Sequence, residues 1–297
     1  MEPIIVTGKE WAKAVLPDPV LRWLQARRQV WFARRTRARD RQVFINHLRA
    51  DDVFVVGHPK SGNTWVAYML ALLSYPDRQD QVTLSNIEAY IPLIPGESDS
   101  RISNYPDLPR PRIFRNEVPR YPELYPKTIY LIRDPRAALT SYYHMYRTLF
   151  NDHQTSLHAF VEEYLAQGCI RRWEPVPRWD VQVLEWLKRA RQPERVLILK
   201  YEDMLTDRRA ALEKMARFAR LDCRPEVLDV AVARGAFSSM QKDEAQHGVY
   251  AYPGEIAQRG RFVRSGKSDS WRSEMEARTV QRIEAEFAPA MRACGYA

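Results

Sequence analysis

Three short apolar runs along the chain are each followed by a longer segment with helical periodicity. The runs cover Val53 to Val56, Thr128 to Ile132 and Arg195 to Leu199. The segments after them, which space apolar residues three and four apart, cover Trp65 to Leu73, Arg136 to Tyr146 and Arg208 to Ala219. This alternation predicts an α/β fold, with helices on both faces of a central parallel sheet in a three-layer α/β/α arrangement.

Weaker patterns complete the predicted layout. A fourth strand is expected at Arg112 to Arg115, and further helices are expected at Leu157 to Ala166, Asp180 to Arg191 and Glu274 to Met291. Two stretches rich in proline, glycine and polar residues, Pro92 to Pro111 and Met240 to Arg261, are predicted as loops over a site. With 297 residues, 45% of them hydrophobic, the chain can bury one sizeable core. We expect one domain over residues 46–297, with a basic helical segment over residues 1–45 packed on it.

The first apolar run leads into the loop Gly57-His-Pro-Lys-Ser-Gly-Asn-Thr-Trp65 and then into an apolar helix. Backbone N–H groups and the dipole at the start of such a helix favour a bound anion, and Lys60, Ser61 and Thr64 add donors. The two glycines have the spacing of a nucleotide-triphosphate P-loop. That motif requires lysine directly after its second glycine, where this chain has Asn63. The sequence therefore predicts a P-loop-like phosphate site, with a P-loop kinase or triphosphatase as an alternative.

Candidate ligand-binding residues also follow the second predicted strand. They lie in the run Tyr130-Leu-Ile-Arg-Asp-Pro-Arg-Ala-Ala-Leu-Thr-Ser-Tyr-Tyr-His144. Arg133 leaves the carboxyl end of that strand beside the anion loop, and Ser141 follows two turns into the next helix. A guanidinium and a hydroxyl suit a terminal phosphate. Asp134 is expected to cap the helix, with Pro135 in its first turn. In a triphosphatase, Asp134 would instead hold Mg²⁺.

The run Pro59-Lys-Ser-Gly-Asn-Thr-Trp65 closely resembles the 5′-phosphosulfate loop of sulfotransferases that use 3′-phosphoadenosine 5′-phosphosulfate (PAPS). The family usually has threonine where this chain has Asn63. The resemblance covers roughly residues 50 to 285. It implies sulfuryl transfer from PAPS to a hydroxyl, with no metal expected. The loop residues that it implies for binding the donor are Lys60, Ser61, Gly62, Asn63, Thr64 and Trp65.

The same resemblance assigns the rest of the nucleotide. Arg133 and Ser141 correspond to the residues that hold the 3′-phosphate, and Trp65 is expected to stack on the purine. Tyr201 of the Tyr-Glu-Asp run, together with Phe237 and Met240, corresponds to the adenine contacts. Arg264 and Gly266 match the element that closes over the 3′-phosphate. There Ser265 replaces the lysine of the family, and whether Lys267 compensates is left open.

The base expected from the resemblance differs from the usual one. Cytosolic sulfotransferases carry a histidine in a Lys-Thr-His-Leu-Pro segment, where this chain reads Arg115-Asn-Glu-Val-Pro119. Glu117 therefore takes that place, and the predicted catalytic residues are Lys60, Glu117 and Ser141. A drier pocket would raise the pKa of Glu117 from its solution value near 4.3 and make it a better base. His58 and His144 are alternative bases.

A carboxylate base resembles carbohydrate sulfotransferases, so the expected acceptor is a saccharide or a glycosylated small molecule. A phenol or a lipid alcohol is the alternative.

Charge and cysteine content refine this view only slightly. The net charge of +9 suits a polyanionic nucleotide, but it also suits nucleic acid or an anionic membrane. Much of it lies in residues 20–41, predicted as a helix with a solvated basic face. Peripheral membrane contact through this segment is an alternative, and so is a non-enzymatic, membrane-associated anion binder. No nucleic-acid-binding module is recognisable.

Cys169, Cys223 and Cys294 show neither a disulfide framework nor zinc spacing. No secretion signal or membrane span is expected, so the predicted location is cytoplasmic. The oligomeric state is left open.

Overall fold

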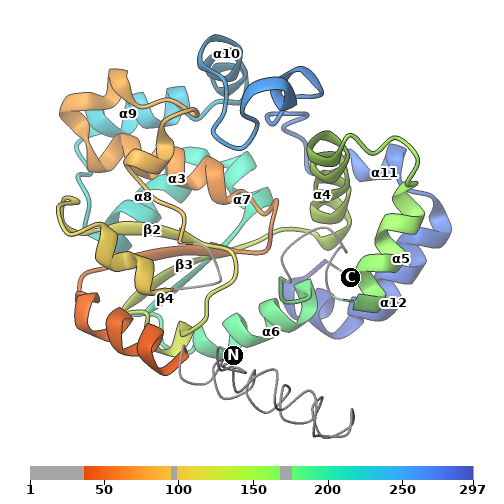
Figure 1. Ribbon diagram of the computed structural model, residues 1–297, viewed down its shortest axis with the longest axis horizontal. Helices are drawn as coiled ribbons and strands as arrows, with labels where there is room; N and C mark the ends of the chain where they lie inside the picture. Colours follow the sequence, from red (N-terminus) through yellow and green to blue (C-terminus); the bar gives the residue numbers. More distant parts are fainter. Residues whose placement is uncertain (1–36, 95–98, 168–175, 297) are drawn as a thin grey trace, which may run out of the picture.

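The computed structural model describes residues 37–94, 99–167 and 176–296. Its centre is a parallel sheet of four strands in the order β2-β1-β3-β4 (Figure 1). The strands are β1 (Val53–Gly57), β2 (Ile113–Asn116), β3 (Lys127–Ile132) and β4 (Val196–Lys200). Each of them lies within a residue or two of a predicted strand, which confirms the parallel sheet.

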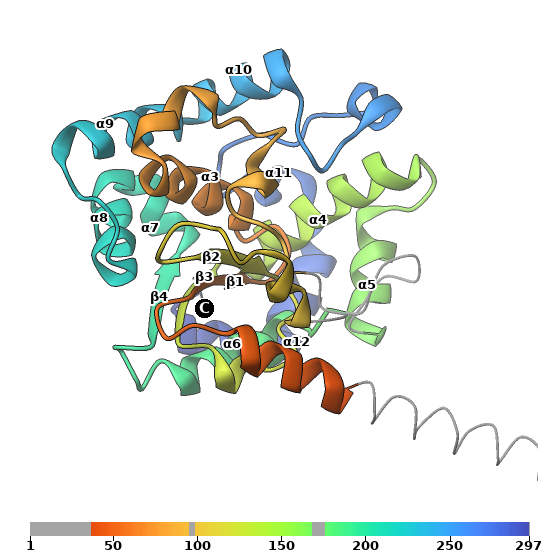
Figure 2. The same ribbon diagram turned by 60° about the vertical axis from the view of Figure 1, so that its left-hand side comes forward.

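Alternate residues of β1 enter two separate cores. Val53 and Val55 belong to one hydrophobic cluster, while Phe54 and Val56 belong to the other. A parallel sheet with both faces buried needs such strands, apolar at every position. The helices on the first side are α3 (Asn63–Ser74), α7 (Tyr201–Thr206), α8 (Arg208–Ala219) and α9 (Pro225–Arg234). Those on the second side are α4 (Pro135–Phe150), α5 (Leu157–Gln167), α6 (Trp179–Arg189) and α12 (Ala277–Cys294). Figure 2 shows the resulting layers, which confirm the predicted three-layer α/β/α fold.

The prediction of a loop over Met240 to Arg261 is wrong in its first half. Helix α10 (Phe237–His247) occupies that half, and a short 3₁₀ helix (Gly254–Gln258) follows. Helix α10 buries only Met240 and Asp243, so it has no apolar stripe to reveal it. A tertiary contact holds it in place, because Asp243 Oδ2 accepts a hydrogen bond from the Leu84 N–H at 2.6 Å.

Other elements also differ from the prediction. Helices α7 and α9 were not expected, and the predicted loop from Pro92 to Pro111 contains a 3₁₀ helix (Asp99–Asn104). The helix predicted from Glu274 is divided, since α11 (Trp271–Glu274) ends there and α12 begins after an extended Met275. Residues 1–36 of the predicted basic segment lie outside the described residues, while residues 37–47 form a helix.

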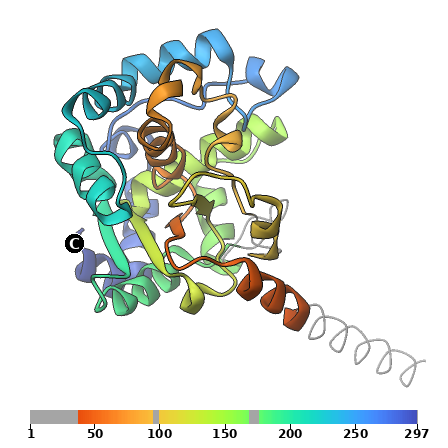
Figure 3. The ribbon, with the colours of Figure 1, turned by 90° about the vertical axis from the view of Figure 1, so that its left-hand side faces the viewer.

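The helix over residues 37–47 and helix α10 lie on opposite sides of the molecule (Figure 3). Within the described ranges, no helix is both long enough and apolar enough to cross a membrane. Residues from the loops at the carboxyl ends of β1, β2 and β3 line the cavity described next.

Candidate active site

The loop between β1 and α3 has an unusual backbone. Lys60 has a left-handed conformation with φ of 68°, which is uncommon and strained for a residue with a side chain. Gly62, with φ of 103°, is the N-cap of α3, and no side chain caps this helix. A Cβ at Gly62 would lie 3.0 Å from the Tyr201 ring, so glycine also permits close packing here. The first N–H groups of α3 have no partner inside the helix and can bind an anion.

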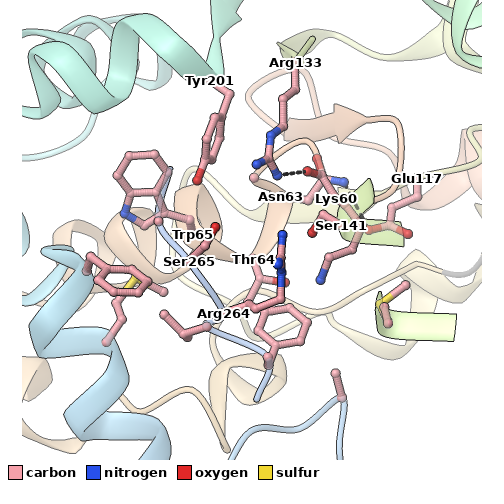
Figure 4. A pocket seen from close by; sticks show the side chains of 18 of the residues that line it. Lys60, Asn63, Thr64, Trp65, Glu117, Arg133, Ser141, Tyr201, Arg264 and Ser265 are labelled. Atoms are coloured by element: carbon pink, nitrogen blue, oxygen red, sulfur yellow. Dashed lines mark hydrogen bonds between the residues drawn. The ribbon is translucent and has the colours of Figure 1, made fainter. Parts of the chain in front are cut away.

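A cavity of about 350 Å³ opens beside this loop (Figure 4). Nearly all the residues predicted from the sequence line it, although they come from segments far apart in the chain. They are Lys60, Gly62, Asn63, Thr64, Trp65, Glu117, Arg133, Ser141, Tyr201, Phe237, Met240, Arg264 and Gly266. Ser61 does not line the cavity: its side chain is fully buried, and its Oγ has no partner among the described residues. The roles assigned to these residues stay predictions.

Glu117 and Lys60 lie at one end of the cavity. Glu117 Oε1 accepts a hydrogen bond from Asn63 Nδ2 at 3.0 Å, and the Lys60 Nζ lies 3.9 Å from the centre of the Phe262 ring. Burial raises the pKa of Glu117, against the opposing effects of the Asn63 hydrogen bond, Arg115 and Lys60. Burial also lowers the pKa of Lys60 to about 8, although Glu117 counteracts it. Burial at this end of the site therefore shifts both pKa values, upward for the Glu117 carboxyl and downward for the Lys60 ammonium.

Arg133 links the two segments that were predicted to bind phosphate. Its Nη1 donates to the Lys60 carbonyl at 2.8 Å, and its guanidinium lies 4.1 Å from the centre of the Tyr201 ring. Its buried Nε has no partner among the described residues. The Asp134 side chain accepts from the Arg136 N–H at the start of α4, which confirms the predicted N-cap. Asp134 also pairs with the Arg136 side chain, so its charge is already balanced.

Aromatic residues surround the other end of the cavity. The Trp65 Nε1–H donates to the Gly235 carbonyl at 2.8 Å, and the Trp65 and Tyr201 rings meet edge to face with centres 5.4 Å apart. Gly266 has φ of 63°, and a Cβ there would lie 2.4 Å from the Phe237 ring. The segment that carries Gly266 therefore crosses the Phe237 ring at a distance that only glycine permits.

The segment over residues 261–266 is fixed to the rest of the site by carboxylates. Glu244 on α10 accepts hydrogen bonds from the N–H groups of Phe262 and Val263, at 2.7 and 2.9 Å. Arg264 Nη1 donates to Glu274 at 2.7 Å. Lys267 is exposed, and its carbonyl lies 3.4 Å from Arg133 Nη2.

The two alternative bases do not line the cavity. Both ring nitrogens of His58 have partners, the Pro59 carbonyl at 3.0 Å and the Tyr164 hydroxyl at 2.8 Å. Burial lowers the pKa of His58 to about 4. His144 Nε2 bonds to Glu274, the carboxylate that also accepts from Arg264. Of the three bases predicted from the sequence, Glu117 is the one that lines the cavity.

Sequence reasoning missed several residues that complete the site. Tyr250 bonds to the Thr64 hydroxyl at 3.1 Å and accepts from the buried Arg115 at 2.6 Å. Phe262 lies under the Lys60 ammonium, and Arg208 lines the aromatic end. Arg115 stands two residues before Glu117 and could have been singled out. Phe262 lies in the segment that carries Arg264 and Gly266, although no role was expected for it, whereas Tyr250 and Arg208 lie in segments without a motif, so only the folded chain brings these two to the cavity.

The sequence of this chain is similar to those of known proteins. Residues 50–295 match the family described as sulfotransferase domain. The amine sulfotransferase of Oryctolagus cuniculus is 25% identical over 257 residues, which cover 82% of each chain. Sulfotransferase 1 family member D1 of Mus musculus is 25% identical over 276 residues, 84% of this chain and 86% of its own.

Solved structures show the same fold. A retinol dehydratase in complex with androsterone and the inactive cofactor PAP has a TM-score of 0.66 at 20% identity, covering 82% of this chain and 81% of its own. Mouse sulfotransferase SULT7A1 complexed with PAP has a TM-score of 0.63 at 23% identity, covering 82% of this chain and 85% of its own. The family match over 246 of 297 residues, from 50 to 295, is consistent with the loop, the arginine and the carboxylate around the cavity. The chain belongs to the sulfotransferase family.

Proposed function

We propose that this sulfotransferase moves the sulfuryl group of PAPS to a hydroxyl of a small molecule, with Glu117 as the general base. The observation that carries the proposal is that Lys60, in the loop before α3, and Glu117, directly after β2, line the same cavity. The Asn63 side chain joins Glu117 to that helix at 3.0 Å. One cavity thus combines an anion loop, a lysine and a buried carboxylate.

The charges around the cavity support an anionic donor. Among the residues that the structure describes, four cationic side chains line it, Lys60, Arg133, Arg208 and Arg264, and one carboxylate, that of Glu117. Such an excess of positive charge in a partly buried space attracts a polyanion. Trp65, Tyr201 and Phe237 offer ring faces and edges for a purine at the opposite end. The arrangement fits a nucleotide with its base among the aromatic residues and its 5′ end near Lys60.

The proposed step uses these residues as follows. Glu117 takes the proton of the acceptor hydroxyl as the acceptor oxygen bonds to sulfur. The bond between sulfur and the bridging oxygen of PAPS breaks, and its electron pair leaves with adenosine 3′,5′-bisphosphate (PAP). Lys60 and the N–H groups of the loop stabilise the charge that grows on this oxygen. Ser141 and Arg133 hold the 3′-phosphate, so that the three reacting atoms lie in line.

The cavity wall favours a phenol or a lipid alcohol as the acceptor over the saccharide that was expected first from the sequence. Two apolar residues line the cavity near Glu117. One is Val118, which directly follows Glu117, and the other is Ile94, whose N–H bonds to the Arg115 carbonyl at 2.8 Å. Leu93, Met145 and Phe262 add further apolar surface to the cavity. A saccharide would leave most of its hydroxyls unpaired against this wall, at a cost of about 1 to 3 kcal/mol for each buried group. A phenol or a lipid alcohol avoids that cost.

The experiment is a transfer assay with the purified protein and labelled PAPS. Its acceptor panel contains phenols, long-chain alcohols, amines and oligosaccharides. We expect label on the phenol or alcohol arm and little on the oligosaccharides. Label on the oligosaccharides alone would restore the saccharide acceptor. A parallel reaction with labelled ATP and Mg²⁺ tests the kinase alternative, and transfer there without transfer from PAPS would overturn the proposal.

A further inference from the structure

The base proposed above is held by a residue that was expected only to bind the donor. Asn63 is the first residue of α3, and its side chain is buried. Its Nδ2 lies 3.0 Å from Glu117 Oε1, 3.1 Å from the Gly57 carbonyl and 3.3 Å from the His58 carbonyl. All three neighbours are acceptors, so the amide nitrogen must face them. The reversed amide would put an oxygen against three oxygens.

Resting on the proposed function, we propose that Asn63 is a positioning residue for Glu117, which fixes the carboxylate and keeps it ionised, rather than a contact of the nucleotide. The hydrogen bond engages Oε1 and orients the carboxylate, and we assign acceptance of the proton to Oε2, the oxygen that does not bond to Asn63. The bonds to Gly57 and His58 tie the amide to the end of β1, which is a rigid support. The position of the Glu117 carboxylate is therefore fixed, through Asn63, by the end of β1.

Packing around Asn63 supports a dedicated arrangement. A Cβ at Gly57 would lie 2.6 Å from Asn63 Oδ1, so the glycine at the end of β1 makes room for this side chain. The peptide of Glu117 is fixed separately, because Gln182 Nε2 donates to the Glu117 carbonyl at 2.9 Å. The Val118 N–H donates to Asn116 Oδ1 at 2.9 Å. Because hydrogen bonds hold the backbone on both sides of Glu117, the Asn63 bond determines the orientation of the carboxylate.

The electrostatic effect of this bond has a definite sign. Burial raises the pKa of Glu117, and the Asn63 hydrogen bond is the largest of the opposing influences, ahead of Arg115 and Lys60. Lys60 in turn faces Arg133, Glu244 and Arg264. A donor to a carboxylate stabilises the ionised form, which is the form that acts as a base. Loss of the donor must therefore raise the pKa of Glu117 and protonate more of it at neutral pH.

The test compares wild type with Asn63→Thr and Asn63→Asp, using the full-length protein. Asn63→Thr removes the amide donor. Asn63→Asp keeps the shape of the side chain but places a second carboxylate beside Glu117. We expect the acid limb of the kcat profile to move up by about one pH unit in Asn63→Thr, and further in Asn63→Asp. The dissociation constant of PAP should stay within about twofold of wild type in Asn63→Thr, because this role does not require nucleotide contact.

Two controls separate this inference from the proposed function. A ¹³C NMR titration of the glutamate carboxyls, with the Glu117 signal assigned through Glu117→Gln, reports the same shift without any turnover. It therefore applies to whichever Asn63 variant folds. If the acid limb and the Glu117 titration are both unmoved in the Asn63 variants while Glu117→Gln is inactive, the positioning role of Asn63 is wrong but the proposed function still stands. If Asn63→Thr weakens PAP binding and leaves the acid limb of the kcat profile unmoved, Asn63 contacts the nucleotide and does not position Glu117. Full activity of Glu117→Gln would instead overturn the proposed base.

Discussion

Lys60 and Glu117 lie at the same end of the cavity, and burial shifts the pKa of each toward neutrality. The base must be ionised and the lysine must be protonated. Turnover therefore rises as pH increases through the pKa of Glu117, and it falls as pH increases through the pKa of Lys60, which is about 8. The predicted profile of kcat/KM for PAPS is bell-shaped. Its acid limb lies above the ordinary glutamate range, and its alkaline limb lies near pH 8.

Measurement of kcat/KM between pH 5 and pH 10, at roughly constant ionic strength, checks this profile, since this ratio reports the free enzyme. Lys60→Arg is the matched variant, because arginine stays charged throughout that range. Its overall rate should fall, as arginine reproduces the position of the lysine poorly, but its alkaline limb should disappear. An alkaline limb near pH 8 that survives in Lys60→Arg would assign that titration to another group.

At the scale of elements, the segment over residues 261–266 is expected to close on the nucleotide through the contact of Gly266 with Phe237. Gly266→Ala forces a left-handed alanine and also a Cβ 2.4 Å from the Phe237 ring. We expect the dissociation constant of PAP to rise about tenfold or more, because the segment must move away from the ring. Titration calorimetry with PAP measures this change.

Gly254→Ala is the control for that variant. Gly254 has a similar φ of 59°, but a Cβ there meets no atom within 4 Å. Both variants therefore share the backbone strain of about 1 kcal/mol, and only one carries the clash. Equal PAP affinities in the two variants would show that the Phe237 contact has no part in binding.

Elements differ in how far the sequence could predict them. The strands and the helices α3 and α4 were predictable, because apolar runs, a glycine-bounded turn and a proline in a first helical turn are local signals. Helix α10 was not predictable, since only Met240 and Asp243 are buried and its position depends on Leu84, far away in sequence. The same limit applies to the site. Lys60, Arg133 and Glu117 follow strands in recognisable runs, whereas Tyr250 and Arg208 reach the cavity only through tertiary packing.

At the scale of the whole molecule, the sheet order β2-β1-β3-β4 explains why these runs converge. β1 lies between β2 and β3, so the residues that follow the three strands meet at one edge of a parallel sheet. That edge carries Lys60 after β1, Glu117 after β2 and Arg133 after β3. The net charge of +9 could not locate the donor site, because any basic surface would give it. The four cations around one cavity do locate it.

The measurement that tests the central claim most directly compares wild type with Glu117→Gln for sulfuryl transfer from labelled PAPS and for PAP binding. Glutamine keeps the size of the side chain and the contact with Asn63, but it cannot accept the proton. We expect turnover to fall by about 10²- to 10⁴-fold while the dissociation constant of PAP stays within about twofold. Turnover equal to wild type in Glu117→Gln would contradict the account.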